Sequence, residues 1–296
     1  MTDADSSNST GSPGSSDSSG SLDSPDTGPS TSETYDEFAA SRSDPRFTDW
    51  LRERAGDSWD DATAHRLTRE LAADELADDV FRQYLVQDYA FVETLVGVFG
   101  HAVGTAPTME SKSELVSFLG VLTDDEDDYF LRAFDALDVP ESVYSEPKTT
   151  PATRAFIDLL ERAAGQGGYA ETLAVLVPAE WVYLSWATDA ADGHTNPDES
   201  PSRFYLSEWV DLHEVDDFEA FVEWLRAELD REGAAASPRR QRRLEQLFRR
   251  TVELEVAFFD EAYELAPSGD STATATSPAS SQSGDGGASQ PGDGRW

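Results

Sequence analysis

The stretch that decides the fold reads FRQYLVQDYAFVETL and runs from Phe81 to Leu95. Because an α-helix completes a turn about every 3.6 residues, residues three and four apart lie on one face. Most residues at such steps in this stretch are apolar: Phe81, Tyr84, Leu85, Phe91, Val92 and Leu95. The spacing predicts a helix that buries this face, and it places one carboxylate, Asp88, on the same face.

The same helical period recurs on the C-terminal side of this stretch. Further apolar runs cover residues 115–122, 156–160, 173–181, 218–229 and 244–263. Proline and glycine fall between the runs, at Pro107, Pro140, Pro147, Pro151, residues 165–168, Pro197, Pro201 and Pro238. No stretch in which apolar and polar residues alternate is long enough to predict a β-strand. The sequence therefore predicts an all-α domain of about seven or eight helices.

Two polar segments flank the helical part. Residues 1–34 and 267–296 are mostly Ser, Asp, Gly, Thr and Pro, and such segments bury too little apolar surface to offset the entropy lost on ordering. We expect disordered tails around one helical domain, residues 35–266. The N-terminus lacks the basic and apolar regions of a signal peptide, and no stretch approaches the ~18 apolar residues of a membrane span. We expect a cytoplasmic protein with no membrane partner.

The chain is strongly acidic, with 59 Asp and Glu against 22 Lys and Arg and a net charge of -37. Such a charge repels nucleic acid, so we expect no nucleic-acid partner. It suits a salt-rich cytosol, where screening shortens charge repulsion to about 3 Å at 1 M, and we interpret it as halophilic adaptation. The chain has no cysteine, which excludes disulfides, thiolate metal sites and a cysteine nucleophile.

Carboxylates interrupt the apolar faces of three predicted helices. Asp88 lies between Tyr84 and Phe91, Glu180 precedes Tyr183 by three residues, and Glu255 precedes Phe258 by three. Any one of them can be a buried acid that an arginine or a backbone group satisfies. Three inward carboxylates beside aromatic residues on separate helices indicate an acidic and aromatic pocket, which suits a flat, nitrogen-rich ring.

Five segments resemble the TenA/thiaminase II family, in the family's order and spacing. They are Phe81–Tyr89, Thr150–Phe156, Val177–Tyr183, Phe204–Val210 and Arg249–Tyr263. The resemblance covers about residues 47–264 and implies a haem-oxygenase-like fold and a homo-oligomer, a tetramer or a dimer. It implies a hydrolase of thiamin-pyrimidine salvage, which cleaves the C–N bond of aminomethyl- or N-formylaminomethyl-pyrimidine to give hydroxymethylpyrimidine. We expect no cofactor and no metal.

The resemblance also assigns roles to individual residues. Asp88 would bind the amidine edge of the pyrimidine, Glu255 would act as the acid–base group, and Tyr183 would orient that carboxylate or the ring. The remaining substrate-binding positions are Tyr84, Phe91, Phe156 and Phe258. Phe91 and Phe156 stand where the cysteine branch of the family often has tyrosine.

The nucleophilic cysteine of the family falls at Ala179, so we do not expect thiamin itself to be cleaved. The neighbouring Glu180 resembles the glutamate that distinguishes a second branch, and it could act as acid to the leaving amine or as base to water. A family tyrosine that follows Trp209 is replaced by Leu212 or His213.

Three other functions stay open at this stage. A catalytically weak pyrimidine-binding protein is possible because the nucleophile is missing. A di-metal oxygenase would need ligands from His101 and the acidic string Asp124–Asp128. A transcription regulator is suggested by the family's historical name, but no helix-turn-helix stands out and the acidic charge opposes direct contact with DNA.

Overall fold

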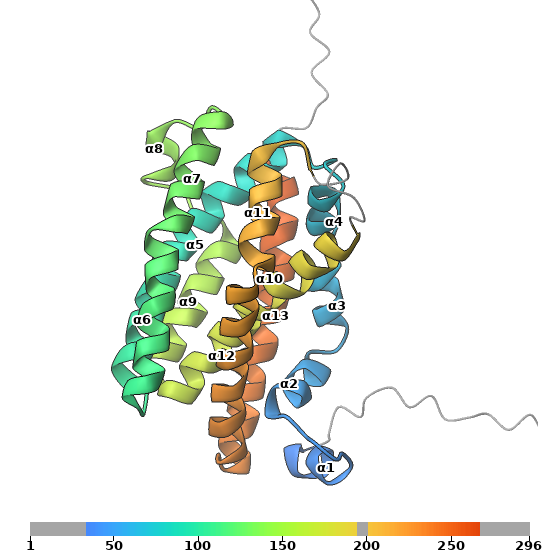
Figure 1. Cartoon of the computed structure of the whole chain (residues 1–296), viewed down its shortest axis with the longest axis vertical. Helices are drawn as coiled ribbons and strands as arrows, with labels where there is room; N and C mark the ends of the chain where they lie inside the picture. The colour runs from blue at the N-terminus through green and yellow to red at the C-terminus, as the bar shows by residue number, and fades with distance from the viewer. Residues whose placement is uncertain (1–33, 194–200, 267–296) are drawn as a thin grey trace, which may run out of the picture.

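Every regular element in residues 34–193 and 201–266, which the computed structural model describes, is a helix (Figure 1). The all-α prediction is therefore confirmed. The predicted tails lie outside the described residues except for Thr34, which caps the first helix. The helices are α1 (Tyr35–Ala40), α2 (Phe47–Ala55), α3 (Asp57–Thr63), α4 (Arg66–Ala72), α5 (Asp78–Thr105), α6 (Met109–Thr123), α7 (Asp125–Ala136), α8 (Glu141–Tyr144), α9 (Pro151–Gln166), α10 (Tyr169–Gly193), α11 (Phe204–Glu214), α12 (Asp216–Ala234) and α13 (Pro238–Leu265).

The expected number of helices was too small for this part of the chain. Eight of the thirteen helices have eleven or more residues, which matches the predicted seven or eight. The helices α1, α3, α4 and α8 have only four to seven residues. A helix of one or two turns is too short to show a period of about 3.6 residues, so the apolar pattern does not reveal it.

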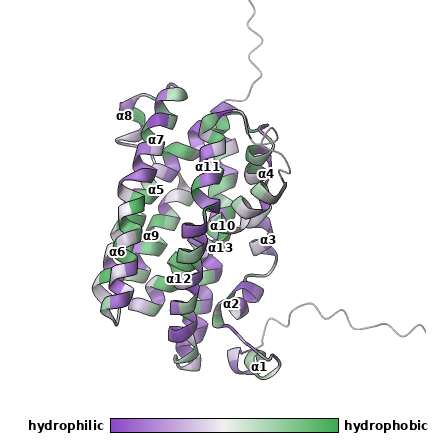
Figure 2. Cartoon of the chain, in the orientation of Figure 1, coloured by the Kyte–Doolittle hydropathy of each residue, from purple (hydrophilic) through white to green (hydrophobic). Residues whose placement is uncertain are grey.

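Helix α10 forms the centre of the molecule. It packs against α9, α11, α12 and α13, and α5 packs beside it against α6, α9 and α13. Residues 169–183 of α10 are buried around the whole circumference of the helix, which is the pattern of a helix enclosed by others. The outer helices α6 and α12 instead carry both hydrophobic and hydrophilic faces (Figure 2).

Prolines mark where several helices begin. Pro151 and Pro238 occupy the first turns of α9 and α13, after the capping residues Thr150 and Ser237. Proline is tolerated there because the N–H groups of the first turn have no acceptor within the helix. Pro178 stands inside α10. It has no N–H to donate to the preceding turn, and it directly precedes two residues that line the cavity described below.

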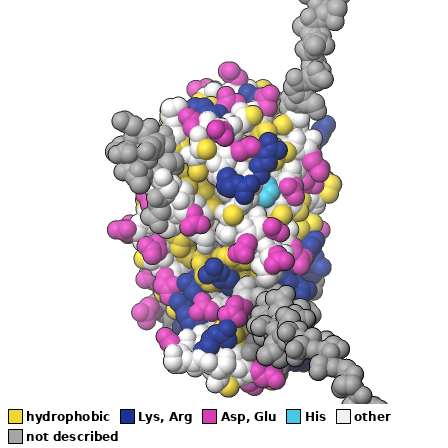
Figure 3. Space-filling model, turned by 90° about the vertical axis from the view of Figure 1, so that its right-hand side faces the viewer, with side chains coloured by type: hydrophobic (Ala, Val, Ile, Leu, Met, Phe, Trp, Pro, Cys, Tyr) yellow, Lys and Arg dark blue, Asp and Glu magenta, His cyan; other side chains and the backbone are white. Residues whose placement is uncertain are grey.

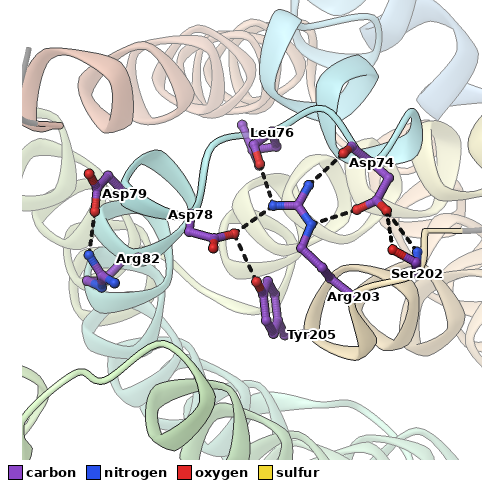
Figure 4. Close-up of polar contacts among 8 residues, drawn as sticks. All are labelled: Asp74, Leu76, Asp78, Asp79, Arg82, Ser202, Arg203 and Tyr205. Atoms are coloured by element: carbon purple, nitrogen blue, oxygen red, sulfur yellow. Dashed lines mark hydrogen bonds and ion pairs between the residues drawn. The ribbon is translucent and has the colours of Figure 1, made fainter. Parts of the chain in front are cut away.

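An arginine fixes the start of α11 against the segment between α4 and α5 (Figure 4). Arg203 donates to Asp74 Oδ1 at 2.7 Å, to Asp78 Oδ1 at 2.6 Å and to the carbonyl of Leu76 at 2.7 Å. Ser202 Oγ donates to Asp74 Oδ2 at 2.6 Å. We call Arg203 with its acceptors Asp74, Leu76 and Asp78 the Arg203 clamp. It holds α11 in place, and α11 forms one wall of the cavity.

Acidic and basic side chains are interspersed on the face shown in Figure 3. Two ion pairs on the described surface join the N-terminal part of α2 to α12, which are far apart in the sequence. Arg46 pairs with Asp230 at 2.6 Å, and Arg226 pairs with Asp49 at 2.9 Å. No helix among the described residues combines the length and the apolar composition that a membrane crossing needs.

Candidate active site

A cavity of about 550 Å³, counting its open mouth, lies among α5, α6, α7, α10, α11 and α12. The wall is mainly apolar and aromatic, formed by Phe91, Val92, Leu95, Phe118, Val121, Leu122, Ala179, Trp209, Leu212 and Phe218. The polar lining residues are Asp88, Glu126, Glu180, Tyr183 and His213.

Carboxyl groups dominate the polar part of this cavity. Asp88 on α5, Glu126 on α7 and Glu180 on α10 line it, and Glu255 on α13 is 1% exposed and electrostatically coupled to two of them. Among the described residues, none of those lining the cavity is Lys or Arg. Asp88 Oδ2, Glu180 Oε1 and Glu255 Oε1 are buried without a hydrogen-bond partner in the described part of the chain. Buried polar atoms normally have partners, so three unpartnered carboxyl oxygens indicate a site for a ligand.

Burial changes the protonation of these groups because a low-dielectric surrounding disfavours the charged form. Burial raises the pKa of Asp88 to about 7, although the hydroxyls of Tyr84 and Tyr183 act in the opposite direction. Burial, followed by the charge of Asp88, raises the pKa of Glu180 to about 8. The same causes, together with the charge of Glu180, raise the pKa of Glu126 and of Glu255 well above the ordinary value. The cavity therefore holds carboxyl groups that carry protons near neutral pH.

Two tyrosines connect helices α5 and α10. Their hydroxyl oxygens, on Tyr84 and Tyr183, are 2.9 Å apart and share a hydrogen bond. Both hydroxyls oppose the rise in the pKa of Asp88, which places them beside its carboxyl group. Tyr183 lines the cavity, whereas Tyr84 is 1% exposed and stands behind the wall. The pair of hydroxyls thus lies next to the carboxyl group of Asp88.

His213 adds a neutral imidazole to the cavity. Its Nδ1 lies 2.8 Å from the carbonyl oxygen of Trp209, and since a carbonyl only accepts, Nδ1 carries the hydrogen. Burial lowers the pKa of His213 to about 4, against the effect of this hydrogen bond. The ring is therefore neutral near pH 7, with Nε2 free to accept a hydrogen bond.

The eight residues predicted from the sequence fall into two layers. Asp88, Phe91, Glu180 and Tyr183 line the cavity. The other four are buried behind the wall: Tyr84, Phe156, Glu255 and Phe258. Phe156 packs on Phe91 with ring centroids 4.5 Å apart, and Phe258 packs on Tyr84 at 5.7 Å. These aromatic residues support the wall from behind.

Sequence reasoning did not include two lining residues, Glu126 and His213, in the site. Glu126 was considered only as part of an acidic string. A signal was present, because Tyr129, Phe130 and Ala133 follow it at three, four and seven residues and place it on the buried face of α7. His213 was noted only as a replacement for a tyrosine.

The arrangement does not match a metal centre. Among the described residues, no group of three or more His, Cys, Asp or Glu side chains is placed to hold a metal ion. His101, one of the ligands that a di-metal site would need, does not line the cavity, and its Nε2 is buried without a partner in the described part of the chain.

A family model, a relative and a solved structure all point to the same family. The model of the TENA/THI-4/PQQC family matches residues 52–265. The chain is 27% identical over 223 residues to an aminopyrimidine aminohydrolase of Halalkalibacterium halodurans, a match that covers 73% of this chain and 95% of that protein. A crystal structure described as a TenA family transcription regulator from a Silicibacter species matches with a TM-score of 0.66 at 23% identity, over 75% of this chain and 97% of that one.

A more distant solved structure supports the expected fold by name. It is a domain of unknown function with a heme oxygenase-like fold from Shewanella denitrificans, and it matches with a TM-score of 0.55 at 13% identity. The match covers 73% of this chain and 92% of that one. The haem-oxygenase-like fold expected from the sequence is confirmed.

Proposed function

Because the chain belongs to the TENA/THI-4/PQQC family, we propose that it hydrolyses the exocyclic C–N bond of an aminomethyl-pyrimidine or its N-formyl form. The product is hydroxymethylpyrimidine, which serves thiamin-pyrimidine salvage. The relative from Halalkalibacterium halodurans carries the name aminopyrimidine aminohydrolase. One observation supports the proposal most directly: aromatic rings surround buried carboxyl groups whose oxygens lack partners in the described part of the chain.

The ring of the substrate fits the aromatic part of the cavity. Phe91 and Trp209 provide flat apolar walls, and the carboxyl group of Asp88, oriented by Tyr84 and Tyr183, faces the amidine edge of the pyrimidine. An amidine edge presents an N–H donor beside a ring-nitrogen acceptor. A carboxyl group whose pKa is about 7 can accept from the first and, when protonated, donate to the second.

In this proposal the acid–base chemistry comes from Glu180, which lines the cavity, and not from Glu255, which lies beside it. With a pKa of about 8, most of it carries a proton at neutral pH, as a general acid requires. Glu180 protonates the leaving nitrogen while the C–N bond breaks and its electron pair goes to that nitrogen. Water adds its oxygen to the methylene carbon, and a proton of that water returns to Glu180. Substrate and water thus become the alcohol and ammonia, or formamide from the N-formyl compound.

The cavity also accounts for the absence of a thiol mechanism. Ala179 lines the cavity directly before Glu180, at the position of the family's cysteine. A methyl group cannot add to the ring, so the reaction must proceed by attack of water. We therefore expect hydrolysis of the aminomethyl compounds without cleavage of thiamin.

The test is hydrolysis of aminomethyl-pyrimidine and its N-formyl form at high salt, by the wild type and by Glu180→Gln. We expect turnover by the wild type and a loss of about a thousandfold or more in the variant, because the variant cannot exchange the proton. If the wild type does not turn over but still binds the ring in calorimetry, the enzyme function is wrong and the chain is a pyrimidine-binding protein.

The remaining expectations concern the setting of the enzyme. We propose that it works as a homo-oligomer in a salt-rich cytoplasm and that residues 35–266 are the folded unit. The net charge of -37 supports the salt-rich setting, because screening removes most of its self-repulsion. Analytical ultracentrifugation across a salt series tests the oligomer, which a monomer at every salt concentration would contradict.

A further inference from the structure

Glu126 is the carboxylate in the cavity that has no assigned role. It lies in the first turn of α7, lines the cavity and is 9% exposed. No hydrogen bond or ion pair of its side chain is found within the described part of the chain, although its helix neighbour Asp127 accepts a hydrogen bond from Tyr89 at 2.8 Å. That bond ties the first turn of α7 to α5. The fold thus holds a buried acid toward the cavity and gives it no partner.

Two acidic neighbours of Glu126 add repulsion to the charged form of this unpaired side chain. Asp88 and Glu180 both act on it electrostatically, and both are acidic. None of the described residues that line the cavity is Lys or Arg. Burial and these two acids raise the pKa of Glu126, so its charged form is unfavourable unless a ligand brings the opposite charge.

The aminomethyl group of the proposed substrate carries a positive charge when it is protonated. We propose that Glu126 binds this group as its ammonium ion, and that the cavity thereby selects the free amine over the neutral N-formyl compound. This inference rests on the proposed function and specifies its substrate. A charge-assisted hydrogen bond is stronger than a neutral one, so the selectivity arises from the one substrate group that differs between the two compounds.

The position of Glu126 suits contact with the exocyclic amine. Val121 on α6 lines the cavity and is 43% exposed, and Glu126 follows it by five residues at the start of α7. In the proposed function the ring is held against Asp88 on α5, which leaves the amine for Glu126 and Glu180. The N-terminal end of α7 stabilises the negative charge that Glu126 needs in this role.

Binding the substrate as a cation is consistent with the chemistry. In the ammonium form the leaving nitrogen already carries the proton that Glu180 donates to a neutral substrate. The positive charge also favours the ionised form of Glu180, which then acts as the base to water. The C–N bond breaks with its electron pair going to nitrogen, water adds its oxygen to the methylene carbon, and the proton of that water passes through Glu180 to the released ammonia. The ammonium form of the substrate and water become the alcohol and an ammonium ion.

The experiment compares kcat/KM for the two compounds in the wild type, Glu126→Gln and Asp125→Asn. Asp125 precedes Glu126 on α7 and is exposed, so its variant loses the same charge outside the cavity. We expect Glu126→Gln to lower kcat/KM for the free amine about tenfold or more, mainly through KM. The N-formyl value and both values of Asp125→Asn should change less than about threefold. An equal fall for both compounds in Glu126→Gln, or no fall in either, would overturn the proposal.

A second variant separates charge selection by Glu126 from a structural role of this residue. A binding measurement separates it from failure of the proposed function. Glu126→Asp keeps the charge and should retain part of the preference for the amine, which a merely structural role of Glu126 does not explain. If the wild type hydrolyses neither compound, the proposed function fails, and calorimetry with aminomethyl- and hydroxymethylpyrimidine still tests the inference. Tighter binding of the cation that disappears in Glu126→Gln supports charge selection, and an unchanged ratio of the two dissociation constants contradicts it.

Discussion

Acidic residues occupy two contrasting regions of this molecule, the Arg203 clamp and the cavity. In the clamp, Asp74 and Asp78 face a guanidinium group (Figure 4). Burial alone would raise the pKa of Asp74, but hydrogen bonds from Ser202 and Arg203 outweigh it and hold that pKa below the ordinary value. In the cavity, Asp88 has no cationic partner among the described residues and its pKa rises to about 7.

The comparison distinguishes acids whose ion pairs stabilise the fold from acids that remain unpaired and can interact with a ligand. A paired aspartate contributes to stability whenever it is ionised. An unpartnered buried aspartate costs stability, and a protein that retains several of them in one cavity uses them for a ligand or a reaction. The contrast can be tested by making the same chemical change in both regions.

The largest difference in kcat/KM is expected between the variants Asp88→Asn and Asp74→Asn. Asp88→Asn removes the proposed contact with the amidine edge, so kcat/KM should fall about a thousandfold, while thermal stability stays equal or rises because a buried acid is gone. Asp74→Asn weakens an ion pair that is partly exposed. It should lower the free energy of unfolding by about 1 kcal/mol and leave kcat/KM of the folded protein nearly unchanged. Similar losses of activity in both variants would contradict the comparison.

The dependence of stability on pH should differ in sign between the two regions. Asp88 and Glu180 have raised pKa values in the folded protein, about 7 and about 8, so between about pH 4 and pH 8 the unfolded state binds fewer protons. The free energy of unfolding must therefore fall as pH rises through this window, by a few kcal/mol. Asp74 has a lowered pKa, so its contribution is lost only as pH falls below about 4.

Urea denaturation at fixed high salt, from about pH 5 to about pH 8, measures this slope. Glu180→Gln should flatten it because the variant cannot titrate there, and Asp74→Asn should leave it unchanged. A wild-type stability that rises across this window would show that the cavity carboxyls are ionised in the folded protein.

The fold was accessible from the sequence because its long helices carry a strong apolar period. The buried face of α5 could be predicted from Phe81 to Leu95, and the last long helix could be placed on the C-terminal side of the break at Pro238. The short helices α3 and α8 could not, because one or two turns provide too few residues for periodicity. Their helical state depends on packing against distant elements, which a local pattern does not contain.

The cavity was only partly accessible from the sequence. Asp88 and Glu180 interrupt apolar faces and could be recognised from spacing alone. Glu126 lies within a string of acids, and only the later residues Tyr129, Phe130 and Ala133 indicate in the sequence that it is on the buried face of α7. The separation into a lining layer and a supporting layer also depends on helix crossing angles, which place Phe156 against Phe91 and not among the lining residues.

A smaller effect is expected from Arg203→Lys, which tests the clamp without removing its charge. Lysine cannot reproduce the fork of hydrogen bonds that Arg203 makes with Asp74, Asp78 and the carbonyl of Leu76. We expect a loss of about 1–2 kcal/mol in the free energy of unfolding. Since the clamp positions α11, KM should rise a few-fold while kcat changes little. Urea denaturation and steady-state kinetics measure both, and a fall in kcat alone would show that α11 does more than form a wall.

The smallest effect is expected from Tyr84→Phe, which removes one hydroxyl behind the cavity wall. The shared hydrogen bond with Tyr183, 2.9 Å long, is lost, and so is one of the two hydroxyls that lower the pKa of Asp88. The pKa of Asp88 should therefore rise further, and the limb of the pH–rate profile that reports its ionisation should move to higher pH. The value of kcat/KM at neutral pH should fall by about tenfold or less, without a change in the free energy of unfolding larger than about 1 kcal/mol. Phe259→Leu is the matched control, because Phe259 packs against both tyrosines but carries no hydroxyl group. If that variant shifts the pH–rate profile as Tyr84→Phe does, packing and not the hydroxyl pair sets the ionisation of Asp88.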